Sequence, residues 1–127
     1  VLKITGLDTK ILAQIFHGQL AAIRNTPPDP KDPQKYRDFN ILTNSCSTII
    51  RNGIKKYGFK NITGMFPRDI FVNVCYYFLV QEKDKRIKAA RRTLPQLMVD
   101  EAAPSVLPPL MNPQNRWKER QLRKLGI

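Results

Sequence analysis

The 127-residue chain has little of what several kinds of functional site require. Its two cysteines, Cys46 and Cys75, are far too few for a disulfide scaffold. With a single histidine, His17, and no pair of cysteines spaced C-x-x-C, we expect no metal site. The longest apolar run, residues 70–80, has about half of the ~20 residues that a membrane-spanning helix needs. These shortages argue against the disulfide-rich, zinc-binding and membrane-spanning classes of protein.

Acidic residues are also scarce, since 10 Asp and Glu stand against 22 Lys and Arg and give a formal net charge of +12. A chain this basic is attracted to nucleic acid, to acidic lipid and to anionic cell-wall polymer, and the charge does not choose among them. The first residues show no secretory signal, so we expect a soluble chain. Because it begins with Val rather than Met, we also expect a fragment or a processed product of a longer protein.

The spacing of apolar residues predicts a short strand followed by helices. Residues 1–5 alternate apolar and polar side chains, as a strand does. Residues 9–24 carry apolar side chains at helical spacing, with Asp8 or Thr9 as the cap. Four prolines in residues 26–38 rule out a helix or a central strand there and predict a loop.

A second helix is predicted from Ser45 or Cys46 to Gly58. A third is predicted over residues 67–81, with a charged continuation that reaches residue 92. Residues 93–127 form a Pro-rich, basic C-terminal tail, the end of which is predicted to be a short helix. The expected fold is therefore mostly α, with a short N-terminal strand, a domain at residues 1–92 and the extended tail at 93–127.

Cys46 is the residue that bears most on function. The first turn of a helix has exposed N–H groups and about half a unit of positive charge. A thiolate placed there is stabilised, and the thiolate is the nucleophilic form of cysteine. The alternative is that Cys46 is a small apolar residue that only fills space. Cys75 lies within the apolar stripe of the third predicted helix, so we expect it in the core.

The segment YRDFNILTNSCSTIIRNGI, residues 36–54, resembles the signature of a bacterial family of circularly permuted papain-like cysteine hydrolases. These enzymes are relatives of the NlpC-type cell-wall peptidases and of the lecithin–retinol acyltransferase-like enzymes. Residues 4–16 and 66–71 are similar to the segments that precede and follow the motif in that family. The resemblance implies that residues 1–92 are the helical portion of a permuted α+β papain-like fold.

The same resemblance implies that Cys46 is the catalytic nucleophile. Ser47 and Thr48 then occupy the hydroxyl positions after the cysteine, and Arg51 is the arginine of the motif. The family has Asn or Asp directly before the cysteine. This chain departs from that pattern, because it has Ser45 there and Asn44 one residue earlier.

The implied reaction is acyl transfer without a cofactor, in which the Cys46 thiolate attacks a carbonyl, a thioester forms and water releases the acid. The substrate would be a peptide or isopeptide amide, as in cell-wall cross-links, or an ester or amide of a lipid. An effector or toxin that acts on the bacterial envelope, secreted or periplasmic, fits both kinds of substrate. Its partner would be anionic envelope polymer or an acidic lipid surface.

A cysteine hydrolase also needs an imidazole within reach of the sulfur. His17 is a poor candidate for this base, because helical spacing places it on the polar side of its helix. In the family that the motif resembles, the histidine precedes the cysteine in a Gly-His context, which is absent here. We therefore expect an upstream segment or a separate chain to supply it.

Two basic clusters favour a different function. Both are candidates for anion binding. The first cluster consists of Lys83, Lys85, Arg86, Lys88, Arg91 and Arg92. The second surrounds Trp117 and consists of Arg116, Lys118, Arg120, Arg123 and Lys124. No recognised nucleic-acid-binding motif accompanies them. The alternative to a hydrolase is thus a non-catalytic binding module for nucleic acid, acidic lipid or a partner protein, in which Cys46 is structural.

Overall fold

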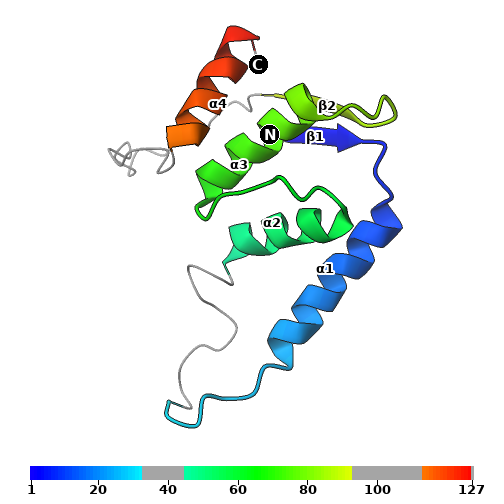
Figure 1. Cartoon of the computed structure of the whole chain (residues 1–127). Coiled ribbons are helices and arrows are strands. Elements are labelled where there is room, and N and C mark those ends of the chain that lie inside the picture. The colour runs from blue at the N-terminus through cyan, green and yellow to red at the C-terminus, as the bar shows by residue number, and fades with distance from the viewer. Residues whose placement is uncertain (33–44, 93–112, 127) are drawn as a thin grey trace, which may run out of the picture.

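The computed structural model describes residues 1–32, 45–92 and 113–126, which are mostly helical (Figure 1). The mostly α prediction is thereby confirmed. In chain order the elements are β1 (Leu2–Thr5), α1 (Thr9–Arg24), α2 (Cys46–Tyr57), α3 (Pro67–Tyr76), the π-helical turn η1 (Tyr77–Gln81), β2 (Lys88–Arg91) and α4 (Pro113–Lys124).

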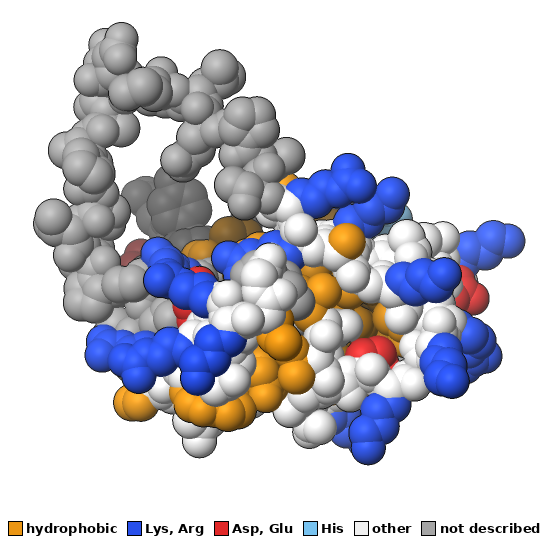
Figure 2. Space-filling view, turned by 90° about the horizontal axis from the view of Figure 1, so that it is seen from above, with side chains coloured by type: hydrophobic (Ala, Val, Ile, Leu, Met, Phe, Trp, Pro, Cys, Tyr) orange, Lys and Arg blue, Asp and Glu red, His pale blue; other side chains and the backbone are white. Residues whose placement is uncertain are grey.

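The helices pack in sequence order, α1 on α2, α2 on α3 and α3 on α4 (Figure 1). Helix α1 extends away from the rest and makes its main contact with α2. Seen from above, the surface shows a band of hydrophobic side chains with Lys and Arg on both sides (Figure 2). The helix predicted at the end of the tail is confirmed as α4.

The third helix does not continue to Arg92, so that prediction was wrong. Helical structure ends at Gln81, and residues 88–91 form β2, which pairs antiparallel with β1 in the register Leu2↔Arg91 and Ile4↔Ala89. The N-terminal ammonium of Val1 donates to the Arg92 carbonyl at 2.7 Å and extends this ladder. Pairing with β1 outweighs the helix propensity of Lys, Ala and Arg, because it satisfies the backbone groups of both strands.

Carboxylates of the intervening turn break the helix. The Glu82 side chain accepts from the N–H groups of Lys83 and Asp84, both at 2.9 Å, and the Asp84 carboxylate accepts from the Arg86 N–H at 3.0 Å. Such local side-chain acceptors compete with helical hydrogen bonds. The turn therefore forms where the charge pattern alone predicted more helix.

The predicted boundaries of the first two helices are confirmed. The Asp8 carboxylate caps α1 by accepting from the N–H groups of Lys10 and Ile11 at 2.9 and 3.1 Å. The Asp8 N–H donates to the Tyr57 hydroxyl at 2.7 Å, which joins the start of α1 to the end of α2. Helix α2 ends at Gly58, whose φ of 136° lies in the region that glycine adopts readily.

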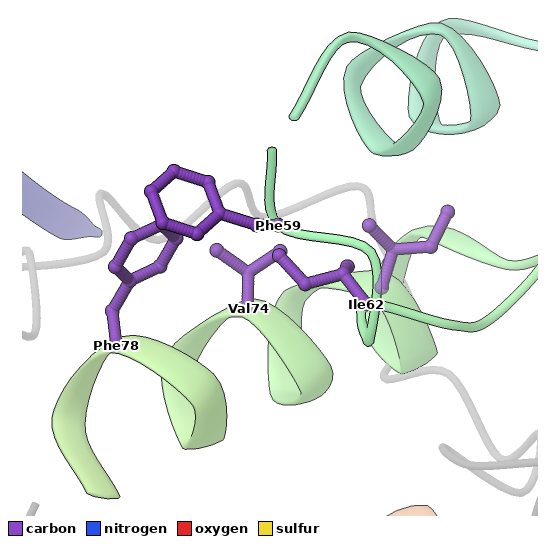
Figure 3. Close-up of a cluster of buried hydrophobic side chains, with 5 residues drawn as sticks. Phe59, Ile62, Val74 and Phe78 are labelled. Atoms are coloured by element: carbon purple, nitrogen blue, oxygen red, sulfur yellow. The ribbon is translucent and has the colours of Figure 1, made fainter. Parts of the chain in front are cut away.

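The main core lies between α3, η1 and the loop after α2. Figure 3 shows the rings of Phe59 and Phe78 side by side, with Val74 and Ile62 in the same cluster. The rings of Phe59 and Phe78 lie edge to face with centroids 4.7 Å apart. Ile70 completes the cluster, so one face of α3 is buried by residues that precede it in the chain.

A second cluster joins α3 to α4. Cys75 and Leu122 are fully buried there beside Tyr76, which confirms the prediction that Cys75 lies in the core. A buried polar network runs alongside: Asn115 donates to the Asp69 carboxylate at 3.0 Å, and Asn73 donates to the Asn115 side-chain oxygen. Because these buried groups satisfy one another, they fix α4 at one position on α3.

Two glycines provide a matched test of this fold. Gly6→Ala should lower the free energy of unfolding by more than about 1 kcal/mol, because Gly6 has a φ of 90° and the added Cβ would lie 2.0 Å from the Arg86 carbonyl oxygen. Gly18→Ala, within α1 and with nothing within 4 Å of its added Cβ, should raise it by about 0.5–1 kcal/mol. Urea unfolding measures both, and equal effects would contradict the packing of Gly6 against the turn.

Candidate functional site

The start of α2 is fixed by a capping box. Ser45 is the N-cap, and its hydroxyl accepts from the Thr48 N–H at 3.3 Å. In return, the Ser45 N–H donates to the Thr48 hydroxyl at 2.9 Å. Ser47 adds a third buried hydroxyl, 3.0 Å from that of Ser45. The hydroxyl residues on either side of the cysteine thus define where the helix begins.

Cys46 is the first residue of α2 and is exposed. This corresponds to the predicted position at a helix start and not to the alternative of a buried, space-filling residue. Its side chain lines a pocket of about 340 Å³ between β1, α2 and α3.

The loop after α2 is tied to the start of that helix. Arg51 donates through its guanidinium to the Gly64 carbonyl at 2.5 Å and to the Asn52 side-chain oxygen at 3.1 Å. The Ser47 hydroxyl lies 3.5 Å from the Met65 carbonyl oxygen. Arg51 therefore holds, through a backbone carbonyl, the loop that leads into α3.

Cys75 differs from Cys46 in its exposure to solvent. Its side chain is fully buried, and burial raises the pKa of its thiol to about 11. Arg91 opposes this shift through its positive charge, but burial has the larger effect. At neutral pH Cys75 is therefore an inert thiol.

The other predicted site residues are not all brought to Cys46. His17 is exposed on α1 and is not among the described residues that line the Cys46 pocket. Asn44 lies outside the described residues. The structure thus gathers Ser45, Ser47 and Thr48 around the cysteine but adds no imidazole from this chain.

The first basic cluster lies on the turn and on β2, not on a helix. Lys83, Lys85 and Lys88 are exposed. Arg86 forms an ion pair with Asp84 at 2.7 Å, and its hydrogen bonds lower the pKa of that carboxyl to about 2. Arg91 is partly buried: its side chain is 26% exposed, and its guanidinium lies over the Phe71 ring and 3.8 Å from the Glu119 carboxylate.

The second basic cluster divides between the two faces of α4. Lys118 faces inward, where it donates to the Asn73 side-chain oxygen and lies over the Tyr76 ring, and burial lowers the pKa of its ammonium group. Arg123 lies 3.5 Å from Glu119 but is mostly exposed. Trp117 lies on the outward face and is about half exposed. The same face carries three further cations: Arg116, Arg120 and Lys124.

Sequence reasoning missed the residues that complete the pocket. Leu2 and Ile4 lie on one face of β1 and enter the pocket wall with Phe71 of α3. Their alternation with polar neighbours was the available signal, but it did not identify what they face. The interhelical network of Asp69 and Asn115 was also missed, since its members lie 46 residues apart in the chain.

Comparisons with models of protein families, with curated proteins and with solved structures find no match to this chain. The papain-like resemblance of the cysteine motif therefore stays a prediction. No helix among residues 1–32, 45–92 and 113–126 is long and apolar enough to cross a membrane. The same residues contain no group of three or more His, Cys, Asp or Glu side chains placed to hold a metal ion.

The two thiols should differ strongly in reactivity. At pH 7 iodoacetamide should modify Cys46 at least about 100-fold faster than Cys75, because Cys75 is buried and its pKa is about 11. Cys75 should become reactive only as the pH approaches that value. Peptide mass mapping over time measures both rates, and unfolding the chain in denaturant serves as the control because it should remove the difference. Similar rates in the folded chain would contradict this account.

Proposed function

We propose that this chain carries the nucleophile of a cysteine hydrolase or acyltransferase, with Cys46 forming a thioester to the substrate's acyl group. The observation that supports this most directly is the position of Cys46, exposed at the first residue of a 12-residue helix and beside a pocket. A cysteine that only filled space would be buried, as Cys75 is.

The reaction follows from the helix start. The sulfur of Cys46 lies at the first turn of α2, where unpaired backbone N–H groups carry partial positive charge. Sulfur attacks the carbonyl carbon of an ester or amide, and backbone N–H groups at the same helix start stabilise the negative oxygen that develops. The alcohol or amine leaves with a proton, and water then cleaves the thioester and returns a proton to sulfur.

The proton transfers need a base that the described residues do not place at the sulfur. His17, the only histidine in the sequence, is exposed on α1. We infer that the imidazole comes from residues outside this sequence, on an upstream segment or on a partner chain. An envelope-acting bacterial hydrolase, directed to anionic envelope polymer or acidic lipid by its net charge of +12, is the form of this proposal that the sequence motif favours.

A second candidate is a basic binding module. It is favoured by the outward face of α4, where Trp117 is 52% exposed among Arg116, Arg120 and Lys124. Exposed cations around an aromatic ring are suited to phosphate groups of nucleic acid or acidic lipid. On this alternative Cys46 has no chemical role.

Acylation with and without added imidazole tests the nucleophile. Incubation with p-nitrophenyl butyrate should give one acyl adduct on Cys46, seen by intact mass and peptide mapping. Added imidazole should increase p-nitrophenolate release over the sum of the separate background rates, because it supplies the missing base. Cys46→Ala should abolish the adduct and reduce this release to background.

The control is Cys75→Ala, which removes the buried thiol and should leave the adduct on Cys46. Acyl groups spread over lysines, or an unchanged rate in Cys46→Ala, would contradict a catalytic Cys46. If binding of single-stranded RNA or anionic vesicles then weakens steeply with salt and equally in both variants, the binding module is the correct function.

A further inference from the structure

The pocket beside Cys46 is almost wholly hydrocarbon. Beyond the cysteine and Ser47, its described lining consists of apolar side chains from three elements: Leu2, Ile4, Ile50, Pro67, Ile70, Phe71 and Val74. Its volume of about 340 Å³ lies at the lower end of the range for small-molecule sites. The site is thus a small apolar pocket with a nucleophile in its wall.

From this lining we propose that the group transferred through Cys46 is an unbranched aliphatic acyl chain, which fills the pocket while its carbonyl lies at the sulfur. This inference rests on the proposed function and names its substrate class. The substrate is thus an ester or amide of an aliphatic acid, as found in lipids, rather than a peptide.

The scarcity of polar groups in the pocket favours an acyl chain over a peptide. A peptide segment brings N–H and C=O groups that must be paired when they leave water. Ser47 is the polar side chain available besides the cysteine in the described lining, and its hydroxyl already lies 3.0 Å from that of Ser45 and 3.5 Å from the Met65 carbonyl oxygen. An acyl chain needs no polar partners beyond its carbonyl, which lies at the helix start.

The shape of the wall agrees with a linear chain. Pro67, Ile70 and Val74 follow one another along one face of α3, at the spacing that aligns side chains in a row. Seven residues of helix extend about 10 Å, roughly the length of an eight-carbon chain. Ile50 lies one turn along α2 from Cys46, so the same helix provides the nucleophile and part of the wall.

The acylation step needs only two reactants, the Cys46 thiolate and the ester that the test supplies. Sulfur of the thiolate forms a bond to the carbonyl carbon, and the bond from that carbon to the ester oxygen breaks. With a p-nitrophenyl ester the oxygen leaves as p-nitrophenolate and takes the electron pair, so no general acid is required.

The test compares p-nitrophenyl acetate, butyrate and octanoate as acyl donors below their aggregation limits. Formation of acyl-Cys46 should be at least about tenfold faster with octanoate than with acetate, because buried methylenes favour binding. Glutathione, which has no pocket, gives the intrinsic effect of chain length on thiol reactivity and is the reference.

Two exposed apolar residues provide matched variants. Ile50→Asp places a charge in the pocket wall and should reduce the octanoate-to-acetate ratio to within about twofold of the glutathione ratio. Leu20→Asp changes a side chain of similar exposure on α1, outside the pocket lining, and should leave the ratio unchanged.

The outcomes separate the two proposals. If Cys46 is acylated without preference for the longer chain, or if Ile50→Asp keeps the preference, the acyl-chain inference is wrong and the nucleophile proposal survives. If no ester acylates Cys46, the proposed function itself is wrong. If sedimentation shows a dimer that Ile50→Asp dissociates, the pocket is an interface between two copies, and the inference is overturned.

Discussion

The position of the Cys46 sulfur depends on the hydrogen bonds between Ser45 and Thr48. They start α2 at Cys46 and leave the thiol exposed at the helix end that carries positive charge. Arg51 then holds the next loop through the Gly64 carbonyl, and that loop leads into α3. The capping box and Arg51 thus hold the two segments that border the Cys46 pocket, the start of α2 and the loop into α3.

Helix α3 connects the site to the rest of the molecule. Its first turns form the pocket wall, one face packs on Phe59 and Ile62, and another holds α4 through Cys75 and the polar network. The two thiols therefore have opposite surroundings although both belong to helices of one small domain. Cys75 stabilises the fold as a buried apolar group, while Cys46 remains accessible.

Local signals in the sequence were sufficient for the starts of the three main helices and the ends of the first two, because these depend on neighbours within a few residues. The strand β2 could not be predicted in this way. Its residues favour a helix on their own, and only pairing with β1, more than 80 residues away, makes them extended. For the same reason the sequence placed Cys46 at a helix start, whereas the pocket walls from β1 and α3 and the inward direction of Arg91 and Lys118 required the fold.

We expect Cys46 to react because a capped helix starts there, and removing the cap tests this most directly. Ser45→Ala loses the hydroxyl that accepts from the Thr48 N–H, which destabilises the first turn by about 1 kcal/mol. Ser45→Thr retains a capping hydroxyl. The rate of Cys46 alkylation under native conditions should fall several-fold in Ser45→Ala and stay close to that of the unaltered chain in Ser45→Thr. Equal rates in all three proteins would show that the helix start does not govern this thiol and would contradict the account.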